Sequence, residues 1–430
     1  MSDFLQPVAS LFRTATRDSA GLASQYTEGL LSSLQRKNME RMEEAIPGVS
    51  RQNLQQFISD SPWSHRALMD HVALQAAAFL GPHPDLCLHL DESCFAKKGP
   101  ASAGVARQWN GRLGKVDNCQ VGVFAALNRG AHSALIDAAL YLPKAWVEDI
   151  PRCAKAGLPP EEILLRSKCD LAFALVKRAL EKGLQPAWVG VDAGYGKNTA
   201  FLQRLEDELG ACFMADIPKS RRVWLERPEA GSLPCREVLK KGVKVAALDG
   251  SGAGLPAWRE VTARRGPGGP VTVQARALRV WLWSGRKKDA PRQWWLLSRQ
   301  IGGVVKHSLS NAPEDTGLPR LVFMAGQRYF IERAFEDGKS SVGMAGYQVR
   351  KWLGWHHHMA MVMLASFFLL KERLLAAETL PELTVADLVY VLHHLLPRRG
   401  VITVDAEAIS EQLDRRLARK RRSAKAEKKN

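Results

Sequence analysis

Cysteine is scarce in this chain of 430 residues, and none of its seven cysteines belongs to a CxxC pair. Because the cysteines are scattered and odd in number, we expect neither a disulfide framework nor a structural zinc site, and a reducing cytoplasm is the expected compartment. The pattern GxxxxGK[ST] is also missing, which excludes a P-loop nucleotide site.

Long apolar runs are missing as well. The longest run, residues 359–370, has 12 residues and is too short to cross a bilayer, so it predicts a buried helix. The first residues, MSDFLQPVAS, lack a basic region followed by a long apolar stretch, and no signal peptide is expected. We therefore predict a protein without a membrane segment.

Positive charge, by contrast, is abundant. The chain has 61 lysines and arginines against 44 acidic residues, a formal net charge of +17. Residues 414–430 hold nine of these cations and two acids, a net +7, which leaves +10 for the rest. A basic body fits a polyanion such as DNA. The final segment is either a disordered tail that makes nonspecific phosphate contacts or a frayed helix around RRLARKRR.

Two short apolar runs lead directly into acidic residues. Residues 86–90 (LCLHL) precede Asp91 and Glu92, and residues 186–191 (PAWVGV) precede Asp192. Both runs predict buried strands of an α/β sheet, and ligands tend to bind at the carboxyl ends of such strands. Neighbouring side chains on a strand point to opposite faces, so only one acid of the first pair belongs to a site, and we choose Asp91.

A third acid lies in the segment 325–358, AGQRYFIERAFEDGKSSVGMAGYQVRKWLGWHHH. On a helix, Arg328, Glu332 and Lys339 fall within about 60° of one another. One carboxylate between two cations fits a metal ligand beside two groups that hold phosphate oxygens. The alternative is an ordinary surface helix with paired charges.

Taken together, Asp91, Asp192 and Glu332 form a set of hard oxygen donors. Such a set holds two divalent cations about 4 Å apart, and Mg²⁺ suits it, with Mn²⁺ as a substitute. Without metal, three clustered carboxylates repel one another and raise one another's pKa, so the arrangement is not explained by packing.

Several blocks of the chain resemble the DDE transposases of bacterial insertion sequences, in the branch with a Tyr–Arg–Glu–Lys signature around the third acid. The resemblance covers most of the chain in family order. The blocks are YTEGLLSSLQRKNMERM (26–42), FISDSPW (57–63), DESCFAKKGPASAGVARQWNGRLGKVDNCQVGVFAAL (91–127), LYLPKAWVEDIPRCAKAGLP (140–159), VDAGYG (191–196) and the segment 325–358.

The resemblance implies an α/β fold with an RNase H-like core, in which Asp91, Asp192 and Glu332 are the catalytic triad. It also implies that Arg328 and Lys339 are the signature cations. The signature tyrosine falls at Ala325, so its contact is either absent or supplied by another residue, for which Tyr329 is the candidate.

A transposase of this family cuts at the ends of its insertion sequence and joins the freed 3′-hydroxyls to target DNA by two-metal phosphoryl transfer. The implied partners are double-stranded DNA, as transposon ends and target, and a second copy of the chain on paired ends. The protein would be cytoplasmic and nucleoid-associated when bound to DNA. Two alternatives stay open: a catalytically inactive, transposase-derived DNA-binding protein, and an RNase H-like nuclease without strand transfer.

We divide the chain into five parts. Residues 1–80 are predicted to be a helical DNA-binding domain, or alternatively a helical cap on the core. Residues 81–218 form the first part of the core, with a helix over 163–180. A β-rich insertion follows at 219–318 and includes one core strand, assigned to QWWLLSRQI (293–301). Residues 319–397 form the second part of the core, and 398–430 form the basic tail.

Further DNA contacts are predicted outside the triad. Lys97 and Lys98 either hold DNA near the metals or are plain loop lysines, and Arg350 is a further phosphate contact. In the insertion, the candidates for phosphate contact or base stacking are Arg221, Arg222, Arg286, Lys287, Lys288, Trp281, Trp283, Trp294 and Trp295. Three consecutive histidines, 356–358, cannot share a metal site on a helix, and we expect His358 to be packed.

Overall fold

The computed structural model of the chain describes residues 1–430 except 33, 35, 112, 230–237, 239, 251–253, 267–268, 284–289, 381–382, 397–406, 408, 412, 416 and 419–430. Most of the predicted tail, 398–430, therefore lies outside the described residues, as do Arg286, Lys287 and Lys288.

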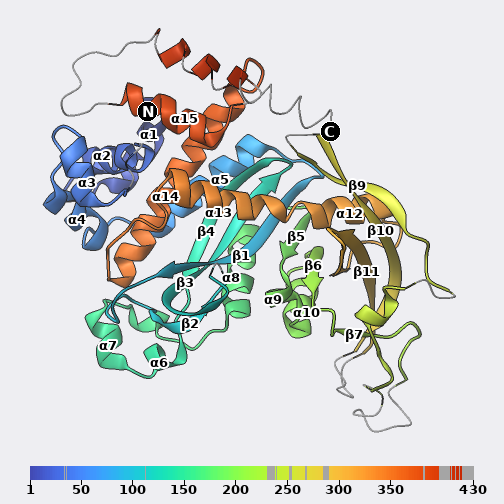
Figure 1. Ribbon diagram of the computed structural model, residues 1–430. Helices are drawn as coiled ribbons and strands as arrows, with labels where there is room; N and C mark the ends of the chain where they lie inside the picture. Colours follow the sequence, from blue (N-terminus) through green and yellow to red (C-terminus); the bar gives the residue numbers. More distant parts are fainter. Residues whose placement is uncertain are drawn as a thin grey trace.

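A ten-stranded mixed sheet forms the centre of the molecule (Figure 1). Its main path runs β2-β3-β1-β5-β6-β12-β11-β10-β9, and β4 pairs with β3 beside it. The bounds are β1 (Leu86–Ala96), β2 (Ala106–Asn110), β3 (Lys115–Arg129), β4 (His132–Leu140), β5 (Trp188–Val191), β6 (Phe213–Ile217), β9 (Arg259–Gly266), β10 (Gly269–Leu282), β11 (Arg292–Ile301) and β12 (Val304–Ser310). The predicted α/β class is confirmed.

Strands β1, β5 and β6 are parallel to one another, and the remaining pairings of the sheet are antiparallel. The predicted strand over 86–90 is part of β1, but β1 does not end at Asp91. It continues to Ala96, because β3 pairs with it along its whole length. Asp91 therefore lies within the strand, next to the point where the shorter β5 ends.

The stretch 219–318 joins this sheet rather than forming a separate one. A small pair, β7 (Arg222–Val223) with β8 (Val243–Lys244), precedes β9 to β12. The strand that pairs with core strand β6 is β12, whereas the expected strand, 293–301, is β11 and lies one place further out. The expected strand is therefore part of the main sheet, with β12 between it and β6.

Helices dominate residues 1–80, as expected. They are α1 (Ser2–Leu5), a 3-10 helix (Gln6–Phe12), α2 (Ala20–Leu31), α3 (Met39–Ala45), α4 (Arg51–Ser59) and α5 (His65–Leu80). The side chains of Asn38, Ser50 and Ser64 accept hydrogen bonds at the starts of α3, α4 and α5. These helices share one hydrophobic core with α14 (Trp352–Leu375) and with the central strands.

Helix α14 contains the apolar run 359–370 and is buried, as predicted. Among the described residues it is the one helix long and apolar enough to cross a membrane, but 89% of its apolar window is buried inside the protein. Its histidines point to separate partners. His357 lies against the carbonyls of Ile58 and Trp63, and His358 bonds the Tyr26 hydroxyl at 2.7 Å, so the packed role expected of His358 is confirmed.

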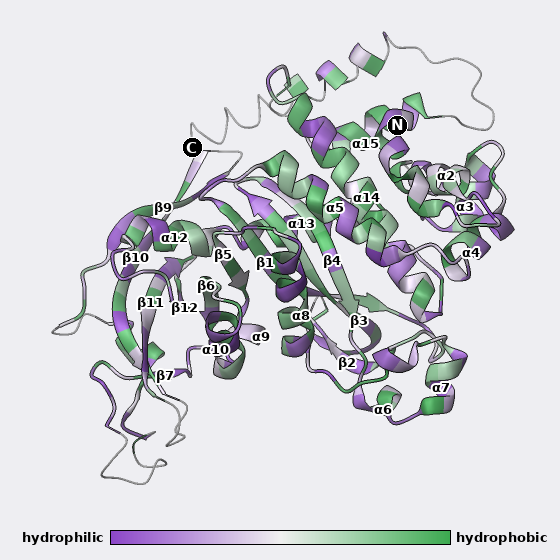
Figure 2. Ribbon diagram, turned by 180° about the vertical axis from the view of Figure 1, so that it is seen from behind, coloured by the Kyte–Doolittle hydropathy of each residue, from purple (hydrophilic) through white to green (hydrophobic). Residues whose placement is uncertain are grey.

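The sheet has helices on both faces. Helices α12 (Leu318–Gly326), α13 (Tyr329–Ser341) and α14 follow one another across one face, and α8 (Lys168–Glu181), α9 (Ala193–Gly196) and α10 (Thr199–Asp207) lie toward the other (Figure 1). Seen from behind, strands β1, β3 and β4 are largely hydrophobic, and the outer strands carry more polar residues (Figure 2). The structure also describes α6 (Lys144–Val147), α7 (Ile150–Lys155) and α15 (Val385–Leu395).

The helix expected over 163–180 begins later, at Lys168. Ser167 and Asp170 form a capping box there, in which each side chain accepts the backbone N–H of the other residue. Leu164 and Leu165, which fall within the expected helix, are exposed in the loop that precedes α8. The helix ends at Glu181, close to the expected end at 180, and Gly183 follows with a φ of +81°, a conformation that favours glycine and ends a helix.

Candidate active site

Two aspartates lie side by side where β1 and β5 run parallel. Leu90 pairs with Val191, so the next residues along the two strands are Asp91 and Asp192. Adjacent strands are about 4.8 Å apart, which makes these two acids neighbours. Asp192 caps α9 by accepting the Tyr195 N–H at 3.1 Å, and Asp91 accepts the Glu92 N–H at 2.7 Å.

Glu92 faces away from this pair. Its carboxylate lies 2.5 Å from the Lys168 ammonium at the start of α8, on the other face of the sheet. The alternation of side chains along β1 thus separates the two consecutive acids, and the one that joins Asp192 is Asp91.

Arg328 is the residue that links the acids of this face. It lies at the amino-terminal cap of α13, after the break that separates α12 from α13. Its Nη2 is 2.8 Å from Glu332 Oε1, one turn along α13, and its Nη1 is 3.5 Å from Asp91 Oδ2. The third guanidinium nitrogen, Nε, is 3.3 Å from Asp216 Oδ2.

The charges of this cluster perturb one another. Burial raises the pKa of Asp91 from 3.8 to about 7, and the negative charges of Asp192 and Glu332 add to the rise, against the opposite pull of Arg328. The acids in turn hold the pKa of Arg328 above its ordinary value, although burial opposes this. A carboxyl that holds its proton near neutral pH is typical of a functional site.

The donor chemistry of Asp91, Asp192 and Glu332 fits a hard divalent cation, and such a cation would offset the repulsion that raises the pKa of Asp91. Their present geometry does not bring them into one coordination sphere. Within the part of the chain that the structure describes, no three His, Cys, Asp or Glu side chains are close enough to hold a metal ion. The guanidinium of Arg328 lies between the acids instead.

Asp216 was not identified from the sequence. It lies on β6, the third of the parallel strands, and accepts hydrogen bonds from the buried Arg299 at 2.8 Å and from the Ser308 hydroxyl at 2.5 Å. The available signal was the same one that revealed Asp192: a short apolar run, CFMA, leading into an acid. The arginine and the serine lie on β11 and β12, about 90 residues further along the chain, and no local pattern connects them to Asp216.

The remaining predicted contacts spread away from the acids. Lys339 lies near the end of α13, its ammonium 5.9 Å from the ring centroid of Phe95 on β1. Lys97 follows the end of β1, six residues or about 20 Å along the strand from Asp91, so neither it nor Lys98 lies among the acids. The ammonium of Lys97 is 3.4 Å from the centroid of the Tyr347 ring, and burial lowers its pKa to about 8. Arg350 is exposed in the loop before α14.

The position of the signature tyrosine is buried. Ala325 is 7% exposed in α12 and belongs to a core cluster with residues of β6, β9 and β10. The backbone is close here, since a Cβ on the following Gly326 would meet the Ala263 carbonyl oxygen at 2.4 Å. Tyr329 is 38% exposed at the start of α13, and the Arg264 guanidinium lies 4.0 Å from its ring centroid.

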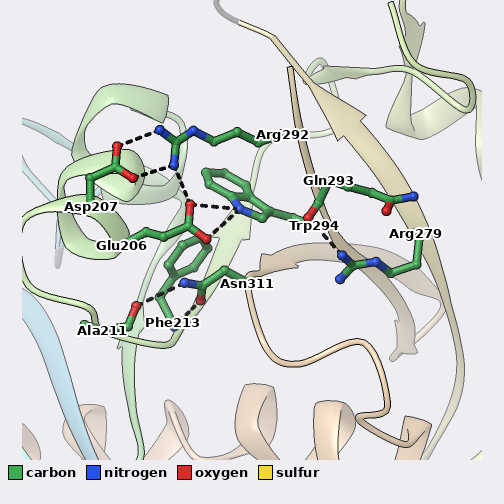
Figure 3. Close-up of polar contacts among 9 residues, drawn as sticks. All are labelled: Glu206, Asp207, Ala211, Phe213, Arg279, Arg292, Gln293, Trp294 and Asn311. Carbon is green, nitrogen blue, oxygen red and sulfur yellow. Dashed lines mark hydrogen bonds and ion pairs between the residues drawn. The ribbon is translucent and has the colours of Figure 1, made fainter. Parts of the chain in front are cut away.

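Several expected contacts of the insertion are internal. Trp294 is buried, and its indole N–H lies 3.3 Å from both carboxylate oxygens of Glu206 on α10 (Figure 3). Beside it, Arg292 makes two hydrogen bonds of 2.6 Å to Asp207. Trp283 is also buried. These contacts fasten β11 to α10, and both tryptophans are core residues rather than exposed stacking platforms.

Comparison with known proteins identifies the family of the chain. Residues 7–279 match the family described as DDE superfamily endonuclease. A probable transposase for insertion sequence element IS701, from Microchaete diplosiphon, is 27% identical over 202 residues. That alignment covers 45% of this chain and 48% of the relative, so the chain spans about half the length of the curated relative it matches. Asp91 and Asp192 lie within the family match, and Glu332 lies beyond it. Because the match covers well over half of its residues, this chain belongs to the DDE superfamily endonucleases.

Proposed function

We propose that the protein is a DNA transposase that cuts at the ends of an insertion sequence and joins the 3′-hydroxyls to target DNA. The observation that carries the proposal is the cluster of Asp91, Asp192 and Glu332 around Arg328, in a chain of the DDE superfamily. The similarity to a probable insertion-sequence transposase supports the same class of reaction.

The order and direction of the core strands support an RNase H-like core. From β4 through β3, β1 and β5 to β6, three antiparallel strands are followed by two that are parallel to β1. In this assignment Asp91 lies on the first core strand and Asp192 follows the fourth, and α13 delivers Glu332 to the same face.

In the proposed site, Asp91, Asp192 and Glu332 hold Mg²⁺. When bound, a pair of such ions lowers the pKa of an attacking water and offsets charge on the leaving oxygen. The chain itself supplies the positioning: Asp192 is fixed by its bond to the Tyr195 N–H, and Arg328 offers its forked N–H groups to the oxygens of the reacting phosphate. Lys339, further along α13, is proposed to bind the DNA backbone.

The proposal is tested by incubating the purified protein with duplexes that carry the inverted repeats flanking its coding region, with Mg²⁺ and with EDTA. We expect Mg²⁺-dependent cleavage at the repeat end and a product in which the cut 3′ end is covalently joined to a target plasmid. Cleavage without joining would identify a nuclease that lacks strand transfer. Binding without cleavage would identify an inactive DNA-binding descendant.

Tyr329 is the proposed replacement for the signature tyrosine. It is exposed next to Arg328, and Arg264 covers one side of its ring. Tyr329→Phe removes only the hydroxyl, and Tyr329→Ala also removes the ring. We expect the alanine variant to cut the repeat end at least several-fold more slowly than wild type under single-turnover conditions, and equal rates would remove Tyr329 from the site.

The basic tail is proposed to bind DNA without sequence preference. Deleting residues 414–430 removes nine cations, so the logarithm of the association constant should fall less steeply with the logarithm of salt concentration. Each phosphate contact contributes about 0.9 to that slope, and we expect the slope to decrease by several units in a fluorescence anisotropy titration. An unchanged slope would contradict contacts by the tail.

A further inference from the structure

Asp216 lies beside the proposed metal ligands, but its oxygens are already engaged. Oδ1 accepts hydrogen bonds from Arg299 and Ser308, and Oδ2 lies 3.3 Å from Arg328 Nε. A carboxylate with both oxygens committed to cations and a hydroxyl is poorly suited to bind a metal ion as well. Its geometry suits the orientation of an arginine.

The partners that hold Asp216 are themselves buried. Ser308 on β12 is directly opposite Asp216 in the β6–β12 register, and Arg299 on β11 is 4% exposed. Arg299 also donates to the Ser308 hydroxyl at 3.0 Å, so the three side chains form a closed set of hydrogen bonds. The backbone of β6 at Asp216 also packs closely against α9. A Cβ added to Gly196 would lie 2.0 Å from the Asp216 carbonyl oxygen.

The three guanidinium nitrogens of Arg328 contact three different acids. Nε, nearest the main chain, faces Asp216, whereas the outer nitrogens Nη1 and Nη2 face Asp91 and Glu332. If Asp91 and Glu332 held a metal ion, the outer nitrogens of Arg328 would be available to phosphate oxygens. The contact of Nε with Asp216 would remain and would fix the plane of the guanidinium.

We propose that Asp216, held by Arg299 and Ser308, is a positioning residue that orients Arg328 toward the reacting phosphate. This rests on the proposed function, because it assigns the phosphate to Arg328. In this role Asp216 touches neither metal nor DNA, and its effect on the reaction passes through Arg328 alone. The core strand β6 and the insertion strands β11 and β12 are therefore joint contributors to the site.

A double-mutant cycle tests this route. We compare wild type, Asp216→Asn, Arg328→Ala and the double variant for single-turnover cleavage of pre-bound DNA with Mg²⁺, after confirming that each is folded by circular dichroism. Loss of a residue that orients a catalytic group lowers activity by about 10- to 100-fold. We expect Asp216→Asn to slow cleavage by that factor in the wild-type background and to have no further effect beside Arg328→Ala.

The proposal would be overturned if the double variant cleaved more slowly than Arg328→Ala by the same factor that Asp216→Asn shows alone. It would also be overturned if Asp216→Asn cleaved at the wild-type rate. If Asp216→Asn does not fold, Ser308→Ala replaces it, because that change removes one hydrogen bond to the same carboxylate and leaves its charge paired. Its slowing, several-fold, should again vanish beside Arg328→Ala, and persistence there would overturn the proposal. Asp207→Asn, which breaks an ion pair with Arg292 at the surface, is the matched control and should cleave at the wild-type rate. A wild type that does not cleave at all would instead refute the proposed function.

Discussion

Asp192→Asn is expected to slow cleavage of the repeat end by more than about 10³-fold, while binding to that end stays within a few-fold of wild type. The substitution removes the negative charge that a metal ion needs. It keeps an oxygen that accepts the Tyr195 N–H, and asparagine caps a helix about as well as aspartate. Helix α9 should therefore remain in place, so that the loss is one of chemistry rather than folding.

The measurement is a single-turnover cleavage assay, paired with an electrophoretic mobility shift assay on the same DNA. Asp207→Asn is a suitable control, because Asp207 lies at the end of α10 and pairs with Arg292 outside the cluster. Cleavage by Asp192→Asn at a rate near wild type would exclude this residue as a metal ligand. Loss of binding together with cleavage would indicate a structural role instead.

Asp91→Asn is expected to abolish cleavage as well, yet to stabilise the metal-free protein above pH 7. Asp91 is 14% exposed, and its pKa is raised from 3.8 to about 7 in the folded protein. Between these values the folded state holds a proton that the unfolded chain has released. The free energy of unfolding therefore decreases as pH rises from about 4 to 7. Above pH 7 the full loss of stability caused by the ionised Asp91 is present.

Asparagine removes this cost, which corresponds to at most about 4 kcal/mol at pH 8. Arg328 keeps two carboxylate partners, Asp216 and Glu332, and is not left unpaired. Urea unfolding in EDTA checks the prediction: the variant should be more stable than wild type at pH 8, with the difference shrinking toward pH 4. Mg²⁺ should narrow the difference by stabilising wild type. A variant that is less stable than wild type at pH 8 would contradict the assignment of the raised Asp91 pKa to burial and to the neighbouring acids.

Local patterns in the sequence were sufficient for the elements whose burial follows a simple period. The run before Asp192 predicted β5, and the apolar run at 359–370 predicted the buried α14. The separation of Asp91 from Glu92 followed from alternation along a strand, and Lys168 does pair with Glu92 on the far face. In each case neighbouring residues carry the information.

The errors arose where distant partners decide the structure. Strand β1 passes through Asp91 because β3 pairs with it over eleven residues, which no pattern within 86–96 reveals. Strand β12 looks too polar for an inner strand, with His307, Ser308 and Ser310, yet all three are buried because other strands supply hydrogen-bonding partners. Its neighbour β11, which has more apolar residues, was therefore the strand that the sequence indicated.

The contacts of Arg328 could also be predicted only in part from the local sequence. Its spacing from Glu332 marks an i, i+4 pair on a helix, and that pair is present at 2.8 Å. The break between α12 and α13 at Gln327 places Arg328 at a helix end, where it contacts acids on β1 and β6, and this break does not follow from periodicity. Asp216 became part of the site only through that break.

The pairing of β12 with β6 has a consequence for protein engineering. Excising residues 219–318 as a removable cassette would expose an unpaired edge on β6, where the backbone groups that now bond to β12 would be free to recruit strands from other molecules. Such a truncation should aggregate rather than yield a minimal nuclease. A smaller enzyme would have to retain at least β11 and β12. The part of the cassette to shorten would be the residues that precede β11.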